Sequence, residues 1–492
     1  MRILLVTHAF PPEGVGGTER YAEAIARGLL QRGHEVRLFS GSLEWREAFA
    51  IERHDHAGLP VTRVHRHDLY FDHWDKLANP HVARAFEAEL DAFRPELIHL
   101  HHWIRLTDDL VRRAAARAIP VVVHLHDHFT NCPRVFRLKP GGDATRPDEL
   151  DFCELDFTAD SCRSCVPRWQ FQGDREIDLS LARYGTAIGA ELAAAQVRIA
   201  LSASQKGELA RFLRRANGAG GPASEPAIDI LGHPWIGGAV DAAGTVAASP
   251  RGQLRLLYFS HLNPIKGPHV LLEALRGLDG VSLDLHGLCA TKGYDERLRE
   301  LARGLEVRFH GPYQRNEPCR TPADVVVIPS LAHETWSFWL DEAARTGLPI
   351  VAADSGALAE RATGRVRLVP ARDVAAWRAA IVALRDDPAQ RAALAAAPAP
   401  DVMTLDRHLE LLLGHYARAA AAITPAAKAA ARPFGLPSAE FTHEWERREL
   451  AFRELLRSEG WEAVLGRQTA EIERLRRELS DRAAEKGSSD RR

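Results

Sequence analysis

The sequence has little of several features that mark special classes of protein. Six cysteines in 492 residues are too few for a chain held together by disulfide bonds. There is no basic surplus of the kind usual in nucleic-acid-binding proteins, because 64 lysines and arginines face 66 aspartates and glutamates. No apolar run approaches the roughly 20 residues that cross a bilayer, and the first run, residues 3–6, is too short for a secretory signal. We therefore expect a cytoplasmic, multidomain α/β protein that does not bind nucleic acid.

The first half of the chain alternates apolar runs with amphipathic segments, which predicts parallel strands joined by helices. Residues 1–8 (MRILLVTH) are a continuous apolar run, as expected for a strand that is buried on both faces. Thr18 then caps a predicted helix whose apolar side chains share one stripe. Further strands are predicted at residues 35–41, 95–102, 119–127 and 197–204.

A second series of the same kind follows residues 217–250, which are rich in Gly, Ala, Pro and Ser. Two such series predict two Rossmann-like, doubly wound domains that face a cleft, and a ligand is expected where the carboxyl ends of the strands meet. The predicted limits are residues 1–235 for the first domain, with a cysteine-rich insertion at 132–170, residues 250–400 for the second domain, and residues 401–492 for a helical, charged tail.

The tail carries a short apolar seam with heptad spacing. Trp461, Leu465, Ile472, Leu475 and Leu479 recur at steps of three and four, with Gln468 interrupting the series. A seam of this length favours a helix that packs on its own domain or lies in solvent. A helix that forms a dimer or binds a partner is the alternative.

The first segment that points to chemistry lies between the first strand and the first helix. Residues 14–19 (GVGGTE) place glycines where backbone amides can approach an anion at a helix N-terminus. Glycines at this point also serve plain tight turns, so both interpretations stay open. The full G-x-G-x-x-G is missing, and no acidic residue closes the second strand, which argues against a nicotinamide enzyme.

Two segments in the second half add charged candidates. Lys266, in the loop SHLNPIKG after a strand, is placed to meet a phosphate, although an ordinary surface lysine fits as well. Glu334 and Glu342 stand on either side of a helix start near Ser337. Both carboxylates can then accept hydrogen bonds from hydroxyls of a sugar or ribose, while free amides meet a diphosphate. The alternative is that both carboxylates are simply solvated.

Taken together, these segments resemble the retaining nucleotide-sugar glycosyltransferases of family 4, which have the two-domain GT-B architecture. The resemblance spans about residues 1–382 and rests on motifs in a fixed order. They are PPEGVGGTE, HLHD, HLNPIKGPHVLLEA, the Glu-x7-Glu block and PIVAADSGALAE.

The resemblance implies a role for each motif. Gly16 and Gly17 would lie against the donor diphosphate or sugar, and His126 would contact the transferred sugar near its anomeric centre. Such enzymes need no catalytic metal, and the chain has no Asp-x-Asp triplet.

The second domain would hold the donor, a UDP- or GDP-sugar. Lys266 and His261 would neutralise the leaving diphosphate. Glu334 would hold hydroxyls of the donor sugar, Glu342 those of the ribose, and Gly311 with the backbone after it would face the nucleobase. The acceptor would be a growing glycan, a lipid-linked saccharide or a similar molecule, and a peripheral membrane contact stays an open alternative.

Two departures from the family pattern concern the donor. The family commonly has Gly-Arg where this chain has Ser260-His261, and an unperturbed imidazole is mostly neutral near pH 7. Ser337 stands where a glycine is usual. A non-catalytic GT-B protein that binds a glycan or a protein partner is therefore the alternative function.

Four of the cysteines lie close together in the insertion. They are Cys132, Cys153, Cys162 and Cys165, and the last two have the Cys-x2-Cys spacing that lets two thiolates bind one metal ion. We expect a structural zinc ion rather than a catalytic one, because four thiolates leave no open position. Independent thiols or a disulfide are the alternatives.

Overall fold

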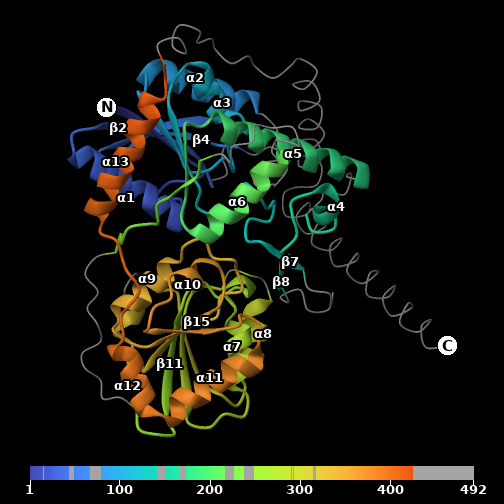
Figure 1. Ribbon diagram of the computed structural model, residues 1–492, viewed down its shortest axis with the longest axis vertical. Coiled ribbons are helices and arrows are strands. Elements are labelled where there is room, and N and C mark those ends of the chain that lie inside the picture. Colours follow the sequence, from blue (N-terminus) through green and yellow to red (C-terminus); the bar gives the residue numbers. More distant parts are fainter. Residues whose placement is uncertain are drawn as a thin grey trace, which may run out of the picture.

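The protein consists of two α/β domains, one above the other in Figure 1, in a computed structural model. The structure describes residues 1–14, 16–43, 49–66, 79–140, 150–166, 173–216, 227–237, 249–289, 291, 293–313 and 317–424. Each domain is built on its own parallel sheet, as the two series of alternating strands and helices predict. The predicted domain limits themselves stay predictions.

The first domain has an eight-stranded sheet in the order β10-β9-β6-β5-β1-β2-β4-β3. Neighbouring strands are parallel except β3 and β4, which form an antiparallel pair at one edge. The strands are β1 (Arg2–Thr7), β2 (Glu35–Gly41), β3 (Ile51–His56), β4 (Leu59–Val64), β5 (Leu97–Leu100), β6 (Val121–His124), β9 (Val197–Ala200) and β10 (Asp229–Ile230).

Helices cover both faces of this sheet because its central strands are apolar on both sides. In β1, Ile3 and Leu5 pack on one face, and Leu4 and Val6 pack on the other. The helices are α1 (Gly17–Gln31), α2 (Pro80–Phe93), α3 (Leu110–Ala116), α5 (Asp174–Ala194), α6 (Ala203–Ala216) and α13 (Leu405–Ala421).

The second domain has a six-stranded, all-parallel sheet in the order β13-β12-β11-β14-β15-β16. Its strands are β11 (Leu254–Phe259), β12 (Val281–His286), β13 (Glu306–Gly311), β14 (Val325–Ile328), β15 (Ile350–Ala353) and β16 (Val366–Val369). Its helices are α7 (Pro268–Leu275), α8 (Tyr294–Leu301), α9 (Phe338–Arg345), α10 (Gly356–Glu360), α11 (Val374–Asp386) and α12 (Pro388–Ala396), with 3₁₀ turns at Pro264–Lys266 and Pro318–Arg320. The predicted doubly wound fold is confirmed.

The chain returns to the first domain at its end. Helix α13 packs on α1, where Leu409 lies against Gly28, and its Leu412 and Tyr416 join the apolar core beside β1. Figure 1 shows α13 beside α1 on the upper domain. The predicted heptad seam at residues 461–479 lies outside the described residues, so its dimer remains a prediction.

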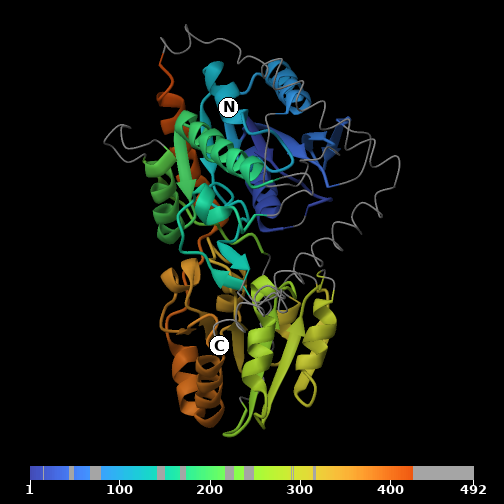
Figure 2. The same ribbon diagram turned by 90° about the vertical axis from the view of Figure 1, so that its right-hand side faces the viewer.

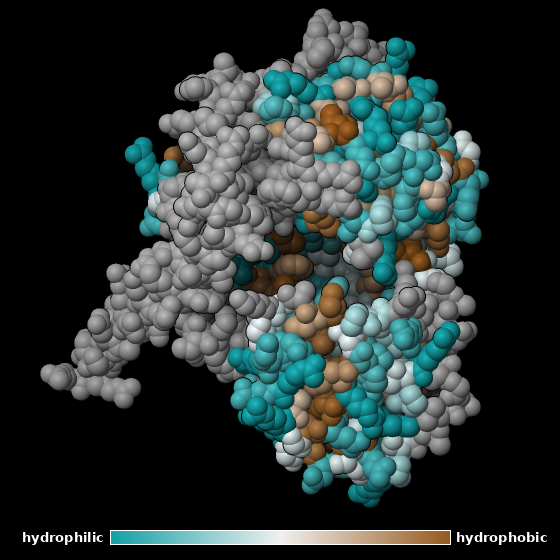
Figure 3. Space-filling view, turned by 180° about the vertical axis from the view of Figure 1, so that it is seen from behind, coloured by the Kyte–Doolittle hydropathy of each residue, from teal (hydrophilic) through white to brown (hydrophobic). Residues whose placement is uncertain are grey.

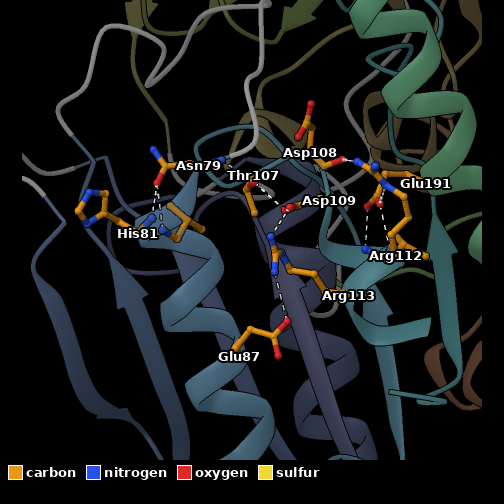
Figure 4. A network of polar contacts seen from close by, with 11 residues as sticks. Asn79, His81, Glu87, Thr107, Asp108, Asp109, Arg112, Arg113 and Glu191 are labelled. Atoms are coloured by element: carbon orange, nitrogen blue, oxygen red, sulfur yellow. Dashed lines mark hydrogen bonds and ion pairs between the residues drawn. The ribbon is translucent and has the colours of Figure 1, made fainter. Parts of the chain in front are cut away.

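A buried polar network fixes the loop between β5 and α3 (Figure 4). Glu191 of α5 accepts hydrogen bonds from the backbone N–H groups of Val111 and Arg112, 2.7 and 3.0 Å away, and from the indole of Trp103 at 2.9 Å. This carboxylate therefore occupies the N-terminus of α3, where the helix dipole favours an anion. Burial nevertheless raises the pKa of Glu191 to about 7 and that of Asp108 to about 8.

Among the described residues, no helix is both long enough and apolar enough to cross a membrane.

Candidate active site

A cleft of about 680 Å³ lies between the two domains, at the carboxyl ends of both parallel sheets. Figure 3 shows the hollow between the two lobes, with apolar groups exposed inside it. Parallel α/β sheets hold ligands at this edge, so the site stands where the topology predicts it. The cleft is lined by Gly16, Gly17, His126, His261, Lys266, Glu334, Ser337 and Glu342 among the residues predicted from the sequence.

Gly311 is the one predicted cleft residue that does not line it. It ends β13 with φ of 76°, and the next two residues, Pro312 and Tyr313, reach the cleft instead. The segment predicted to face a nucleobase is therefore at the cleft, although its glycine is not.

An ion pair between Lys266 and Glu334 lies at the centre of the second domain's side of the cleft. The Lys266 Nζ is 2.7 Å from Glu334 Oε1, and the Ser330 hydroxyl donates to the same oxygen at 2.6 Å. Burial alone would raise the pKa of Glu334, but the Lys266 ammonium and these two hydrogen bonds lower the pKa below its ordinary value. The carboxylate is therefore ionised at neutral pH, and its second oxygen is available as an acceptor.

Local backbone geometry holds the two charged residues in place. Asn263 caps the 3₁₀ turn that ends at Lys266, accepting from the Lys266 N–H at 2.9 Å. The loop of Glu334 is fixed from behind, because the Ala357 N–H donates to the Glu334 carbonyl at 2.7 Å. Gly356 has φ of 51°, and a Cβ there would overlap the Glu334 backbone, so that position needs a glycine.

Helix α9 begins directly after this loop and aims its N-terminus at the cleft. Its N-cap, Ser337, adopts φ of 93° and ψ of 90°, and its hydroxyl accepts from the Leu340 N–H at 3.2 Å. Glu342 lies inside the helix, is nearly buried and lines the cleft. The glycine expected at position 337 would take this conformation without strain, whereas serine does not.

The first domain offers a second helix N-terminus from the opposite wall. Helix α1 starts at Gly17; its N-cap, Gly16, supplies no side-chain cap, and the carboxylate of Glu19 in the first turn bonds its own backbone N–H. Gly16 and Gly17 line the cleft there, and Arg20, one turn further, lines it too. Sequence reasoning missed Arg20, although its place in the first turn after the glycines could have drawn attention to it.

His126 lies in the wall of the first domain, inside a row of hydrogen-bonded histidines. Its Nε2 is 2.9 Å from His101 Nδ1, and its Nδ1 is 3.2 Å from His233 Nε2. Burial, followed by the neighbouring imidazoles, lowers the pKa of His126 well below its ordinary value. His126 is therefore neutral, and its ring orientation is set by its two partners.

His261 lies in the same loop as Lys266, and Arg20 lines the cleft from the opposite wall. Desolvation, followed by these two cations, lowers the pKa of His261 below its ordinary value. The imidazole is therefore neutral at neutral pH, as the unperturbed pKa already suggested.

Hydrogen bonds between the two domains lie beside the cleft. The Thr335 hydroxyl donates to the His126 carbonyl at 2.7 Å, which joins the Glu334 loop to the wall of the first domain. Glu360 of α10 accepts from the backbone N–H groups of Ala203 and Ser204, at the start of α6. These contacts fix the position of one wall of the cleft relative to the other.

Comparison with known proteins identifies the family. The model of Glycosyltransferase Family 4 matches residues 15–155, and that of Glycosyl transferases group 1 matches residues 253–387. The chain belongs to the family 4 glycosyltransferases. The predicted resemblance is confirmed, and the two matched segments carry the two walls of the cleft.

Curated relatives of this glycosyltransferase chain are named for transfer to inositol-type molecules. A phosphatidyl-myo-inositol mannosyltransferase of Mycobacterium leprae is 36% identical over 30% of this chain and 41% of its own length. A D-inositol 3-phosphate glycosyltransferase of Mycolicibacterium smegmatis is 30% identical over 42% of this chain and 52% of its own length. The chain thus spans about half or less of these two relatives. A third relative, D-inositol 3-phosphate glycosyltransferase 1 of Catenulispora acidiphila, is 27% identical over 77% of this chain and 85% of its own length.

Solved structures share the fold of this family 4 chain. HepE of Anabaena, in complex with UDP and glucose, aligns with a TM-score of 0.53 and 18% identity, over 85% of this chain and 99% of that one. A trehalose 6-phosphate synthase of Burkholderia multivorans aligns with a TM-score of 0.56 and 14% identity, over 88% of this chain and 99% of that one. The GT-B fold is therefore established.

The four predicted cysteine ligands gather around a smaller cavity outside the cleft. Cys132, Cys153, Cys162 and Cys165 all line it, and all four are free thiols. As the side chains stand, the described residues contain no group of three His, Cys, Asp or Glu that could hold a metal ion.

The strain at Ser337 gives a test of the site's backbone. Ser337→Gly removes the strained φ but also the hydroxyl cap, a loss of only roughly a few tenths of a kcal/mol for glycine, so it should raise the free energy of unfolding by up to about 1 kcal/mol. Ser337→Ala keeps the strain and loses the cap, so it should lower the free energy by about 1 kcal/mol. Urea unfolding of the two variants and the wild type measures both. A glycine variant less stable than the alanine variant would contradict the strained conformation.

Proposed function

We propose that the protein transfers a sugar from a UDP- or GDP-sugar to a saccharide, lipid-linked or similar hydroxyl-bearing acceptor. The observation that carries this proposal is the ionised pair of Lys266 and Glu334 in the cleft, beside the N-terminus of α9. A cation, free backbone amides and a buried acceptor are what a diphosphate bonded to a polyhydroxyl sugar requires. Family membership supports the same reaction.

The second domain holds the donor in this proposal. The diphosphate lies at the amides of α9 and near Lys266, the donor sugar offers hydroxyls to Glu334, and the ribose offers hydroxyls to Glu342. The base lies toward Pro312 and Tyr313, which also line the cleft. UDP as the nucleotide is supported by the HepE structures, which hold UDP or UDP-glucose.

The first domain receives the acceptor. Arg20 and the amides of α1 face the donor site from the opposite wall. Neutral His126, whose two ring nitrogens bond His101 and His233, contacts the transferred sugar near its anomeric centre without supplying a charge. The relatives' names support an inositol-type acceptor, which presents ring hydroxyls as a saccharide does.

The reaction breaks the bond between the anomeric carbon and the diphosphate oxygen and forms a bond from that carbon to an acceptor oxygen. The acceptor proton leaves with the nucleoside diphosphate. Negative charge develops on the diphosphate, where Lys266 and the α9 amides stabilise it. We propose that the anomeric configuration is retained, as the family resemblance implies; the anomer of the product, read by NMR, tests this.

A non-catalytic protein that binds a glycan or a protein partner is the second candidate. The observation in its favour is the neutral His261 at a position where an arginine is usual. Donor binding without any donor hydrolysis would support this candidate over the enzyme.

Removal of either member of the ion pair should disable the site. Glu334→Ala and Lys266→Ala are each expected to lower turnover about tenfold or more, because each removes an interaction with the donor that strengthens as the diphosphate leaves. The measurement is hydrolysis of the nucleotide sugar that most stabilises the protein in a thermal-shift panel. Glu300→Ala and Lys206→Ala, which change the same residue types outside the cleft, are the matched controls. Wild-type rates in either site variant would refute the assignment.

A permanent charge at position 261 should tighten donor binding. Arginine stays charged at neutral pH and bonds phosphate through two N–H groups. We expect His261→Arg to lower the Kd for the nucleoside diphosphate about tenfold at pH 7.5, which is about 1.4 kcal/mol. Calorimetric titration measures the change, and His261→Gln, which is neutral, should show no such gain. An unchanged Kd in the arginine variant would place the diphosphate elsewhere.

A further inference from the structure

The cysteine-rich insertion forms a small unit beside the cleft, which we call the cysteine module. It comprises residues 132–140 and 150–166 of the described chain, with strands β7 (Leu138–Pro140) and β8 (Leu150–Phe152) and the single turn α4 (Ala159–Cys162). Figure 2 shows β7 and β8 at the level where the two domains meet. Four of the six cysteines of the chain fall within this module.

The module has little apolar core to hold it together. Its two strands pair over three residues each, and a two-stranded pair of this length is not stable by itself. Its buried apolar side chains are Leu138, Leu150 and Val166, together with Cys132, and Phe157 packs outward on the core of the first domain. At its centre is a cavity of about 280 Å³, and all four cysteines line this cavity.

Backbone hydrogen bonds bring the four cysteines in from three separate segments. The Cys165 N–H donates to the Cys162 carbonyl at 2.9 Å, so the Cys-x2-Cys pair forms one tight turn. The Cys153 N–H donates to the Arg137 carbonyl at 2.9 Å, which joins the end of β8 to the segment after Cys132. Cys132 itself closes a turn by donating to the His128 carbonyl at 2.7 Å.

The charges around the cavity favour an anionic centre. Arg134, Arg137 and Lys139 line the same cavity as the four thiols. A zinc ion with four thiolates carries a net charge of about −2, and neighbouring cations offset such a charge. Arg137 also pairs with Glu208 at 3.0 Å.

We propose that Cys132, Cys153, Cys162 and Cys165 bind one structural zinc ion. The thiols as they stand do not form a ligand set, so binding draws the three segments inward until each sulfur lies about 2.3 Å from the ion. Each thiol releases its proton on binding. No bond other than the four Zn–S bonds is formed, and no oxidant is needed.

Such an ion would fix one wall of the cleft. Phe136, between Cys132 and β7, lines the cleft with 43% of its surface exposed. From the other side of the module, Phe152 packs on the core of the second domain, and Asp151 pairs with Arg372. The proposal itself concerns metal binding only and is independent of the proposed glycosyl transfer.

The test is elemental analysis of the full chain, purified with a phosphine reductant and without a chelator. We expect one zinc ion per chain in the wild type and in Cys289→Ser, whose cysteine lies in the second domain. Cys162→Ser and Cys165→Ser should each lower the zinc content at least about fivefold, because three thiolates hold structural zinc poorly. Zinc retained by both variants, or lost from Cys289→Ser, would overturn the proposed ligand set.

A second measurement does not depend on the folding of the variants. Wild-type protein stripped of metal and then loaded with Co²⁺ should show thiolate-to-metal charge-transfer absorption, and four of its six thiols should be protected from a thiol reagent. Zinc-free native protein with four freely reactive module thiols, no charge-transfer absorption after Co²⁺ loading, or a Cys162–Cys165 disulfide in chain purified without reductant would each overturn the proposal.

Discussion

The cleft depends on one partly buried charge, the carboxylate of Glu334. Removal of a carboxylate from water is costly unless a partner compensates for it, and Lys266 and Ser330 are that partner here. The pair joins the loop after β11 to the loop after β14, two neighbouring strands of the second sheet. A ligand with both phosphate and hydroxyl groups can engage the lysine and the glutamate together. Pairing in the free protein also keeps the Glu334 carboxyl ionised and holds both groups in position until that ligand arrives.

The two walls of the cleft are coupled through short polar contacts and through Phe338, which packs on the core of the first domain and stacks on His233. Thr335, directly after Glu334, holds the His126 carbonyl, and His333, directly before it, lies against His128. One loop of the second domain therefore touches the predicted sugar-binding histidine of the first. Helix α13 strengthens the arrangement from behind, because His408 bonds the buried Tyr21, which also meets His124. The end of the described chain thus supports the wall that carries His126.

Local sequence patterns were enough for the fold and for Lys266, Glu334 and Glu342 among the charged residues of the cleft. The runs before Thr18 and Lys266 mark buried strands, and parallel strands bring the loops after them to one edge. Contacts between distant segments could not be predicted in this way. Nothing near His126 in the sequence points to His233, and α13 gives no local sign that it returns to the first domain. Arg20 was missed because a charged residue in a first helical turn is usually solvated, and only the facing domain makes it part of a site.

The central claim is that the Lys266 side of the cleft holds a diphosphate. Calorimetric titration of the wild-type protein with UDP against UMP, and with GDP against GMP, tests it most directly. If the second phosphate meets Lys266 and the amides of α9, at least one diphosphate should bind about tenfold or more tightly than its monophosphate, because a charge-assisted contact contributes about 1.5 kcal/mol or more. Equal affinity within both pairs, or no binding of any of the four, would contradict the account.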